Sequence, residues 1–439
     1  MSLDMKWVAL VCMIGFASIQ SLSSAAYGQA GATPIVSQDV PPTKAQEKIV
    51  TLPEPSGPFG IGRIGYEWID GSRQDAYSSD PDASTPHAPR DLMIYLWYPS
   101  PRKVLAISGV YLPGAKQMDA DPQSQPLVKE EFGDVWPQIL SGDLKSHAQE
   151  NAPIAKSPKT FPVVLFSHGL GGTGFEYTAL IEDLVSRGYV VATIEHTYAA
   201  LAVLFPNGKI VTHHRDPMPP NLTPEQRFQH MIDSSGIEIN QGASDVVFVL
   251  NQLAALNQSG SKSFPLGGRL DLTRVAADGH SAGGAFATRA CQLDARFRAC
   301  ISLDGALPPV SAFPEFPDKK KLQQPVLLLE ADHTGDRMPF SPEQYNEFLK
   351  TKDAELRLCP PGSYDVLLKP AGLSHGSFSD YRLLAANGRP LETEQALHNL
   401  NLIESFTRAF LDRNLKHEKE PLLDSPSQFA EATIKRYGN

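Results

Sequence analysis

The hexapeptide Gly279-His280-Ser281-Ala282-Gly283-Gly284 constrains the fold of this chain more than any other stretch of its 439 residues. An apolar run at 275–277 precedes it, and good helix formers at 285–290 follow it. A strand, a tight turn and a helix around a G-x-S-x-G pattern are typical of a nucleophile elbow, which holds Ser281 at a strained apex above a sheet. Glycine is expected at 279 and 283 because a Cβ there would collide with the neighbouring strand and helix. The alternative is a glycine-rich loop with an incidental serine.

Apolar runs and helical patterns alternate along most of the chain. Strands are expected at 60–71, 91–98, 161–166, 189–194, 299–303, 325–329 and 366–368, and helices at 176–187, at 397–415 and from 224 towards 250, with Thr223 as the N-cap of the last. This alternation indicates an α/β fold, in which helices cover both faces of a mostly parallel sheet. Residues 103–160 and 200–225 lack clear periodicity and are expected to form an irregular cap, or else plain surface loops.

The N-terminal residues predict export. Lys6 is followed by an apolar stretch at 7–19 and by small residues up to Ala30, which is the pattern of a secretory signal peptide over residues 1–30. Cleavage is expected after Ala30, or alternatively after Ala26, and the protein is expected to be secreted or periplasmic. An uncleaved membrane anchor is the alternative, but the apolar run is shorter than the ~20 residues that cross a bilayer. Residues 31–58 are expected to be a flexible leader, 59–420 the catalytic domain and 421–439 a C-terminal tail.

The mature chain is expected to keep three cysteines, Cys291, Cys300 and Cys359. An odd number leaves at least one of them free or paired with another chain. Cys291 and Cys300 flank one helix-to-strand connection and could pair if the geometry allows. The pairing of the three stays open at this point.

Charge and motif content disfavour several function classes. The formal net charge is -10 and no basic stripe is present, so nucleic acid is not an expected partner. No nucleotide-binding glycine motif and no C-x-x-C spacing occur, so neither a nucleotide cofactor nor a structural zinc ion is indicated. His213-His214 with Asp216 could bind a metal, but solvated surface residues are the better interpretation. Metal ions and cofactors are therefore not expected.

A second glycine-rich turn, Ser167-His168-Gly169-Leu170-Gly171-Gly172, directly follows the strand expected at 161–166. In hydrolases with this order of elements, one oxyanion donor comes from such a loop and the other from the residue after the nucleophile. The backbone N–H groups of Leu170 and Ala282 are therefore the expected donors. Glu195-His196 ends the next strand and is expected to line the pocket.

The general base is expected late in the chain. His375 lies in a loop between two glycines, and His333 follows the strand at 325–329. The chain order serine, acid, histidine favours His375. A neutral imidazole there could accept the Ser281 proton and return it to the leaving group.

Three carboxylates at strand ends are candidates for the acid that orients the histidine. Asp304 directly follows the strand at 299–303, while Asp332 and Asp336 follow the next strand. Position alone favours Asp304 only slightly, so all three carboxylates stay candidates for the acid.

Four blocks of sequence resemble those of a known family. They are Phe166-Ser167-His168-Gly169-Leu170-Gly171, Gly279-His280-Ser281-x-Gly283-Gly284, Ser302-Leu303-Asp304 and Gly372-x-x-His375-x-x-Phe378-x-Asp380. Together they are similar to the signature blocks of the platelet-activating factor acetylhydrolases of the plasma and type II kind. The resemblance extends from about residue 57 to about residue 415, and the block around His375 is the most specific.

This resemblance implies an α/β-hydrolase fold that needs no metal and removes short or oxidised sn-2 acyl groups from phospholipids. It places the acid at Asp304 and the oxyanion donors at Leu170 and Ala282. The hypothesis is a secreted serine esterase in which Ser281 attacks, His375 transfers the proton and Asp304 orients the imidazole. A small ester or phospholipid would be the substrate, with transient contact to a membrane surface, and the oligomeric state stays open. The alternatives are a dienelactone-hydrolase-like or polyester-type esterase, and a hydrolase-fold binding protein that has lost catalysis.

Overall fold

The structure is a computed structural model of the chain. It describes residues 50–75, 88–102, 108–214, 218–259, 264–305, 307, 321–333, 342–386, 389–424 and 429–438. The predicted signal peptide and most of the predicted leader lie outside these residues.

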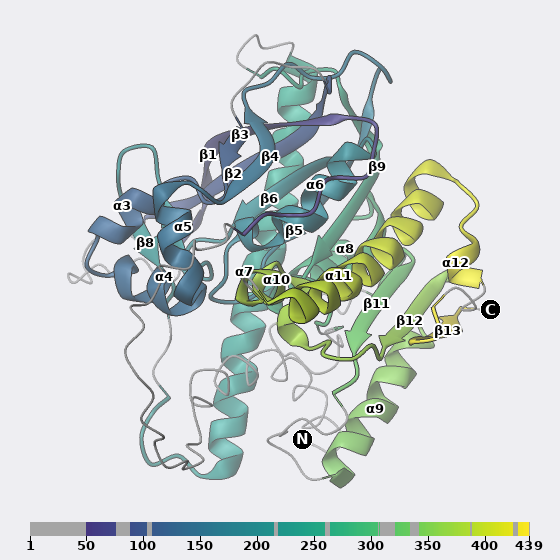
Figure 1. Cartoon of the computed structure of the whole chain (residues 1–439). Helices are drawn as coiled ribbons and strands as arrows, with labels where there is room; N and C mark the ends of the chain where they lie inside the picture. The colour runs from purple at the N-terminus through teal and green to yellow at the C-terminus, as the bar shows by residue number, and fades with distance from the viewer. Residues whose placement is uncertain are drawn as a thin grey trace, which may run out of the picture.

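One eleven-stranded sheet organises the described part of the chain (Figure 1). Its strands follow the order β13-β12-β11-β10-β9-β5-β6-β2-β1-β4-β3. Neighbours from β12 to β6 pair in parallel, while β2 and β13 join antiparallel at the two ends of this parallel block. In chain order the strands are β1 (Gly60–Gln74), β2 (Pro89–Ser100), β3 (Ser108–Val110), β4 (Lys145–Glu150), β5 (Phe161–Ser167), β6 (Val190–Glu195), β9 (Leu270–Gly279), β10 (Phe297–Leu303), β11 (Val326–Ala331), β12 (Ser363–Leu368) and β13 (Ala432–Tyr437).

Helices cover both faces of this sheet, as the apolar strands predicted. The first face carries α6 (Thr178–Ser186) and α11 (Pro390–Leu411), and the second carries α7 (Pro224–Ser259) and α8 (Ala282–Leu293) (Figure 1). Along β5, Val164 and Phe166 pack into the first core, whereas Val163 and Leu165 pack into the second. Side chains alternate between the faces of a strand, so a strand buried on both faces is apolar throughout. The predicted α/β fold is confirmed.

Residues 103–160 are more regular than predicted. Their described part, from 108, contains α3 (Ala115–Ala120), α4 (Ser124–Phe132), the 3₁₀ turn η1 (Gly133–Val135), α5 (Trp136–Ser141) and the strands β3 and β4. The prediction of an irregular segment is wrong here, because helices of six to nine residues are too short for a periodic pattern to stand out. Residues 200–225 contain a hairpin of β7 (Ala202–Leu204) and β8 (Ile210–Thr212).

The C-terminal residues also belong to the fold. Residues 421–439, predicted as a tail, contain α12 (Pro421–Asp424) and the edge strand β13, which pairs with β12. The alternating pattern of a half-exposed edge strand is weak in sequence, so this prediction is wrong. The helix α9 (Pro342–Leu356) was not predicted, whereas the predicted N-cap of α7 is present: the Thr223 hydroxyl accepts the N–H of Gln226 at 3.2 Å.

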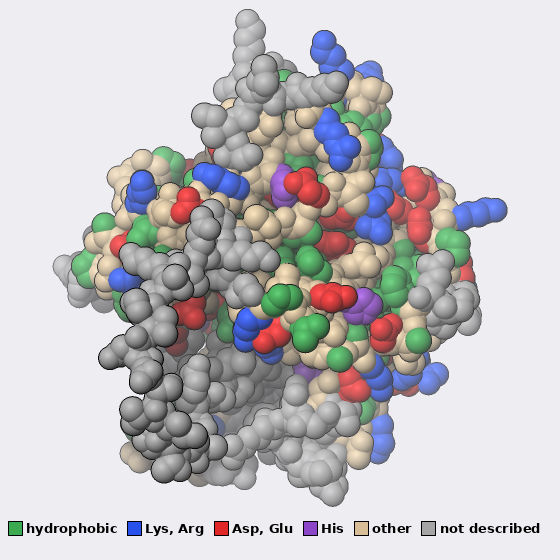
Figure 2. Space-filling model, in the orientation of Figure 1, with side chains coloured by type: hydrophobic (Ala, Val, Ile, Leu, Met, Phe, Trp, Pro, Cys, Tyr) green, Lys and Arg blue, Asp and Glu red, His purple; other side chains and the backbone are tan. Residues whose placement is uncertain are grey.

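One disulfide joins Cys291 near the end of α8 to Cys300 in β10, while Cys359 is free and buried. Among the described helices, none combines the length and apolar character needed to cross a bilayer. On the face shown in Figure 2, basic and acidic side chains are interspersed and apolar side chains form small separate areas.

Candidate active site

Ser281 lies at the sharp turn between β9 and α8, with φ 57° and ψ -121°. A side chain at position 279 would place its Cβ 2.3 Å from the Gly283 carbonyl oxygen, and one at position 283 would place it 2.2 Å from the Ser167 oxygen. The predicted need for glycine at both positions is therefore confirmed. The left-handed φ of a serine stores strain that the packed strand and helix maintain.

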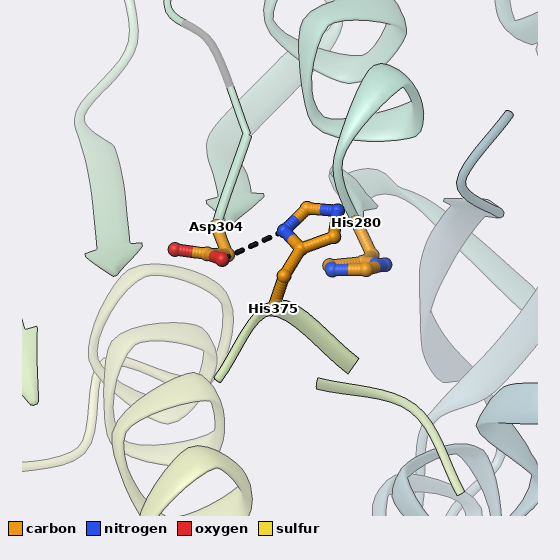
Figure 3. Close-up of side chains that lie close together, drawn as sticks. All are labelled: His280, Asp304 and His375. Atoms are coloured by element: carbon orange, nitrogen blue, oxygen red, sulfur yellow. Dashed lines mark hydrogen bonds and ion pairs between the residues drawn. The ribbon is translucent and has the colours of Figure 1, made fainter. Parts of the chain in front are cut away.

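The structure brings Ser281, His375 and Asp304 into one chain of contacts. Ser281 Oγ lies 3.0 Å from His375 Nε2, and His375 Nδ1 lies 2.7 Å from Asp304 Oδ2. Figure 3 shows the carboxylate of Asp304 facing the imidazole of His375. With Nδ1–H donated to the carboxylate, Nε2 carries the lone pair that can accept a proton from Ser281. The arrangement can therefore generate a serine nucleophile.

Asp304 follows β10 at φ 44° and has two further donors. Its Oδ1 accepts the N–H of Ala331 at 2.9 Å, and Nε2 of His333 lies 3.0 Å from Oδ1 and 3.1 Å from Oδ2. Burial alone would raise the pKa of Asp304, but the hydrogen bonds from His333 and His375 outweigh it and hold the pKa far below its usual range. Asp304 thus stays ionised next to His375.

The loop that carries His375 is fixed from two sides. The backbone N–H of Ser374 donates to Ser377 Oγ at 3.0 Å, and the N–H of Asp380 donates to the backbone carbonyl of Glu176. His280 is the residue before the elbow serine, and its ring centroid lies 4.4 Å from that of His375. Burial, together with the neighbouring His375, lowers the pKa of His280 well below its ordinary value, so this ring stays neutral.

The two predicted oxyanion donors lie at the turns that follow β9 and β5. Ala282 is the first residue of α8, and Leu170 belongs to the loop after β5. Within the described residues, neither backbone N–H donates to a protein acceptor, whereas the neighbouring Gly169, Gly171 and Gly283 amides all do. These two amides are free to receive a developing negative charge.

The other candidates named from sequence lie elsewhere. Asp332 forms an ion pair with Lys369 at 3.2 Å, and the third acid candidate, Asp336, lies outside the described residues. Asp216 also lies outside them, so the metal site with His213-His214 has no described third ligand. Glu195 and His196 are both buried beneath the loop of Leu170, and His196 lines a pocket together with Arg90, Tyr198 and Phe286.

The sequence pattern predicts no role for His333, because the chain order favours His375 as the base. The structure instead places His333 against the same carboxylate. The signal that could have found it is its position after β11, the strand adjacent to β10, since carboxyl ends of neighbouring parallel strands meet at one edge.

One group of possible metal ligands falls within the site. Ligand atoms of His280, Asp304 and His375 lie within 4.8 Å of one another. Both ring nitrogens of His375 are already engaged, with Ser281 and Asp304, so these contacts fit proton transfer better than metal binding.

The chain is similar to known proteins in sequence and in structure. The model of the family described as platelet-activating factor acetylhydrolase, isoform II, matches residues 44–420. The "Platelet-activating factor acetylhydrolase" of Cavia porcellus is 26% identical over 310 residues, which are 64% of this chain and 64% of that protein. The "Probable 1-alkyl-2-acetylglycerophosphocholine esterase" of Arthroderma benhamiae is 28% identical over 400 residues, which are 86% of this chain and 91% of that protein. The match therefore spans just under two thirds of the first relative.

A solved structure shares the fold. The ferulic acid esterase from Streptomyces cinnamoneus is 29% identical and superposes with a TM-score of 0.65, covering 89% of this chain and 100% of that one. The α/β-hydrolase fold and the family resemblance inferred from the four sequence blocks are thus confirmed.

Proposed function

The chain belongs to the platelet-activating factor acetylhydrolase, isoform II, family, and from this premise we propose that it is a serine esterase that cleaves short sn-2 acyl esters of phospholipids. The observation that carries the proposal is the contact chain from Ser281 through His375 to Asp304, beside two amides without a protein acceptor. Relatives named acetylhydrolase and 1-alkyl-2-acetylglycerophosphocholine esterase support the substrate class.

In the first half of the proposed reaction, Ser281 Oγ attacks the ester carbonyl carbon while His375 Nε2 accepts the hydroxyl proton. The ionised Asp304 stabilises the imidazolium that forms. The carbonyl oxygen becomes an oxyanion that accepts hydrogen bonds from the amides of Leu170 and Ala282, each worth about 2.7–4 kcal/mol of transition-state stabilisation. The intermediate then collapses: the bond between the carbonyl carbon and the lysophospholipid oxygen breaks, and His375 gives its proton to that departing oxygen. The acyl group stays on Ser281.

In the second half, a water molecule takes the place of the alcohol. His375 accepts a proton from this water, whose oxygen attacks the acyl carbon through a second oxyanion. Collapse of that intermediate returns the proton to Ser281 Oγ and releases the short carboxylic acid. The same five groups, three side chains and two backbone amides, therefore serve both halves.

We further propose that the protein is exported through its N-terminal 30 residues. The Cys291–Cys300 disulfide supports this, since such bonds persist mainly in oxidising compartments. Sequencing the N-terminus of protein recovered from outside the cytoplasm tests it, with a start at residue 31 or 27 expected. A start at residue 1 would contradict it.

A second candidate is an esterase for soluble aromatic esters, which the similarity to a ferulic acid esterase favours. Such an esterase would use the same Ser281, His375 and Asp304, so only substrate preference distinguishes the two candidates.

The decisive experiment measures hydrolysis of phosphatidylcholine with an sn-2 acetyl group, phosphatidylcholine with a long sn-2 chain, and methyl ferulate. The Ser281→Ala variant serves as the blank. The proposal expects the acetyl lipid to be cleaved faster than either other substrate by at least about tenfold, which corresponds to about 1.4 kcal/mol of barrier. Preference for methyl ferulate would support the second candidate, and wild-type rates equal to the blank on all three would overturn both.

A further inference from the structure

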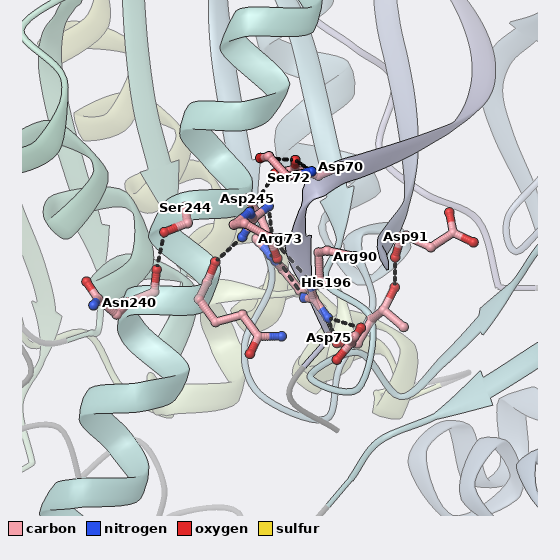
Figure 4. Close-up of polar contacts among 12 residues, drawn as sticks. Asp70, Ser72, Arg73, Asp75, Arg90, Asp91, His196, Asn240, Ser244 and Asp245 are labelled. Carbon is pink, nitrogen blue, oxygen red and sulfur yellow. Dashed lines mark hydrogen bonds and ion pairs between the residues drawn. The ribbon is translucent and has the colours of Figure 1, made fainter. Parts of the chain in front are cut away.

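A second polar cluster lies buried beneath the loop that carries Leu170. Asp245 reaches from α7 to the sheet, where its Oδ2 lies 2.7 Å from Arg90 Nη2 and 2.9 Å from His196 Nδ1 (Figure 4). Arg73 adds a second ion pair to Asp245 at 2.9 Å. We refer to Arg90, Asp245 and His196 as the buried relay. None of its three side chains is more than 2% exposed.

The contacts of the buried relay fix where the protons lie. Asp245 is ionised: burial would raise its pKa, but Arg90 and His196 outweigh this and hold the pKa far below its usual range. His196 therefore donates Nδ1–H to Asp245, and its Nε2 accepts the hydroxyl of Ser167 at 2.9 Å. Burial is the largest influence on His196 itself and lowers its pKa, so the ring stays neutral.

The contacts of His168 fix its tautomer as well. The backbone N–H of His196 donates to His168 Nε2 at 3.2 Å, so that nitrogen must carry a lone pair. The ring proton of His168 is then on Nδ1, which lies 2.7 Å from the carbonyl oxygen of Gly169 and donates to it. Burial and the nearby His196 lower the pKa of His168 to about 3, which keeps this neutral tautomer.

The Gly169 carbonyl belongs to the same peptide group as the Leu170 N–H. In a planar trans peptide the C=O and N–H bonds point in opposite directions. A hydrogen bond that holds the carbonyl towards His168 therefore turns the Leu170 N–H the other way, out of the buried cluster. Gly172 N–H, at 3.0 Å from the same carbonyl oxygen, strengthens this orientation.

We propose that the buried relay, acting through His168, aims the Leu170 N–H at the oxyanion of the reacting ester. His168 is thus a positioning residue rather than a catalytic one, and the inference rests on the proposed hydrolysis at Ser281. The other side of the loop is held independently: Gly169 N–H donates to the Tyr177 hydroxyl at 3.0 Å, and that hydroxyl lies 2.8 Å from His280 Nδ1. The loop is therefore tied both to the buried relay and to the elbow.

A matched pair of substitutions at His168 tests the inference. In His168→Asn the amide nitrogen can take the place of Nδ1 and still donate to Gly169, whereas in His168→Gln the amide reaches only the position of Nε2. His168→Asn therefore keeps the contact with the Gly169 carbonyl and loses the contact with the His196 N–H, whereas His168→Gln does the opposite. His168→Asn should keep kcat on a soluble acetyl ester within about 1.5-fold of the wild-type value. His168→Gln should lose about 10- to 100-fold in kcat with little change in KM, because one oxyanion donor is worth up to about 10²–10³.

Melting temperatures and the affinity for a transition-state analogue distinguish a positioning role of His168 from a purely structural one. A trifluoromethyl ketone places an oxyanion in the site, so its affinity should fall with kcat in His168→Gln and stay near wild type in His168→Asn. Equal kcat per folded molecule in both variants would overturn the inference. Should His168→Gln not accumulate as folded protein, Ser167→Ala replaces it: a fall of about threefold in kcat is expected from its weaker neutral hydrogen bond, and an unchanged kcat would overturn the inference.

The proposed function is tested separately in the same assay. Turnover by Ser281→Ala at the wild-type rate would remove the serine mechanism whatever the His168 variants do. An inactive Ser281→Ala together with two equal His168 variants would leave the mechanism standing and remove only the role of His168.

Discussion

The molecule contains the same three side-chain types in the same order of contact twice. In the candidate active site, serine, histidine and aspartate are joined at 3.0 and 2.7 Å, and beneath it Ser167, His196 and Asp245 are joined at 2.9 and 2.9 Å. The two sets differ in backbone and surroundings. Ser281 sits at a left-handed elbow beside two unpaired amides, whereas Ser167 ends a regular strand and is fully buried. Hydrogen-bond geometry alone therefore does not identify a nucleophile.

The histidines and carboxylates of the two sets differ as well. The His375 side chain is 12% exposed, so substrate and water can reach it, while His196 is completely enclosed. Asp304 pairs with two histidines, whereas Asp245 pairs with one histidine and also neutralises the buried Arg90 and the partly exposed Arg73. The first set is therefore arranged for proton transfer and the second for fixing a loop.

The largest expected difference lies between the two serines. Ser281→Ala should lower kcat by about 10⁴-fold or more with the fold intact, because the nucleophile is lost. A fluorophosphonate probe should label Ser281 and leave Ser167 unmodified, which peptide mass spectrometry after digestion can determine. Labelling at Ser167 in the wild-type protein would contradict the prediction that only Ser281 of the two serines acts as a nucleophile.

Substitution of Asp304 should mainly affect catalysis, whereas substitution of Asp245 should mainly affect stability. Asp304→Asn should cut kcat by about 10⁴-fold with little change in melting temperature, because the imidazole loses its tautomer and orientation. Asp245→Asn should first lower the free energy of unfolding, by roughly 3–5 kcal/mol at most, because buried Arg90 loses one of its two carboxylate partners and keeps only Asp75. Kinetics and chemical denaturation of both variants measure this contrast. Asp332→Asn is the control, since its carboxylate pairs with Lys369, and a large loss of kcat there would move the acid to β11.

A smaller effect is expected at His333, the additional partner of Asp304. His333→Ala should lower kcat by about tenfold, because a hydrogen bond to a charged group contributes about 1.5–3 kcal/mol. His333→Gln, whose amide nitrogen can occupy the position of Nε2, should recover most of this loss. Steady-state kinetics test this, with melting temperatures as the folding control. An unchanged kcat in His333→Ala would show that His375 and the Ala331 N–H orient the carboxylate without His333.

The effect with the least consequence for catalysis concerns the dependence of stability on pH. The pKa of His168 is about 3 in the folded chain, whereas an unfolded histidine titrates near 6.5. Between these values the unfolded chain binds more protons, so His168 makes the fold less stable as pH falls through that window. His168→Asn removes this contribution, and its free energy of unfolding should fall less steeply than that of the wild type, by up to about 1.4 kcal/mol per pH unit. Denaturation curves measured from about pH 7 to 4 test this; parallel curves would mean that the His168 ring is not kept neutral by burial.

Local sequence was sufficient wherever a feature depends on neighbouring residues. The elbow around Ser281 follows from two glycines and their flanking strand and helix, and the glycine-rich loop after β5 was located in the same way. Continuous apolar strands predicted the doubly covered sheet, because a strand buried on both faces needs no polar positions. The edge strand β13 and the short helices α3 to α5 were missed, since few residues and partial exposure leave little pattern.

By itself the sequence determined the class of fold, the position of the elbow and which residue types stand at the ends of the strands. Only the tertiary structure decided which of them meet: that Asp304 faces His375 and His333 together, and that Asp245 of α7 reaches His196. Strand and turn patterns are read from neighbours in the chain. Contacts between residues 49 or 71 positions apart depend instead on strand order and helix packing, which bring them together only when the whole sheet has formed.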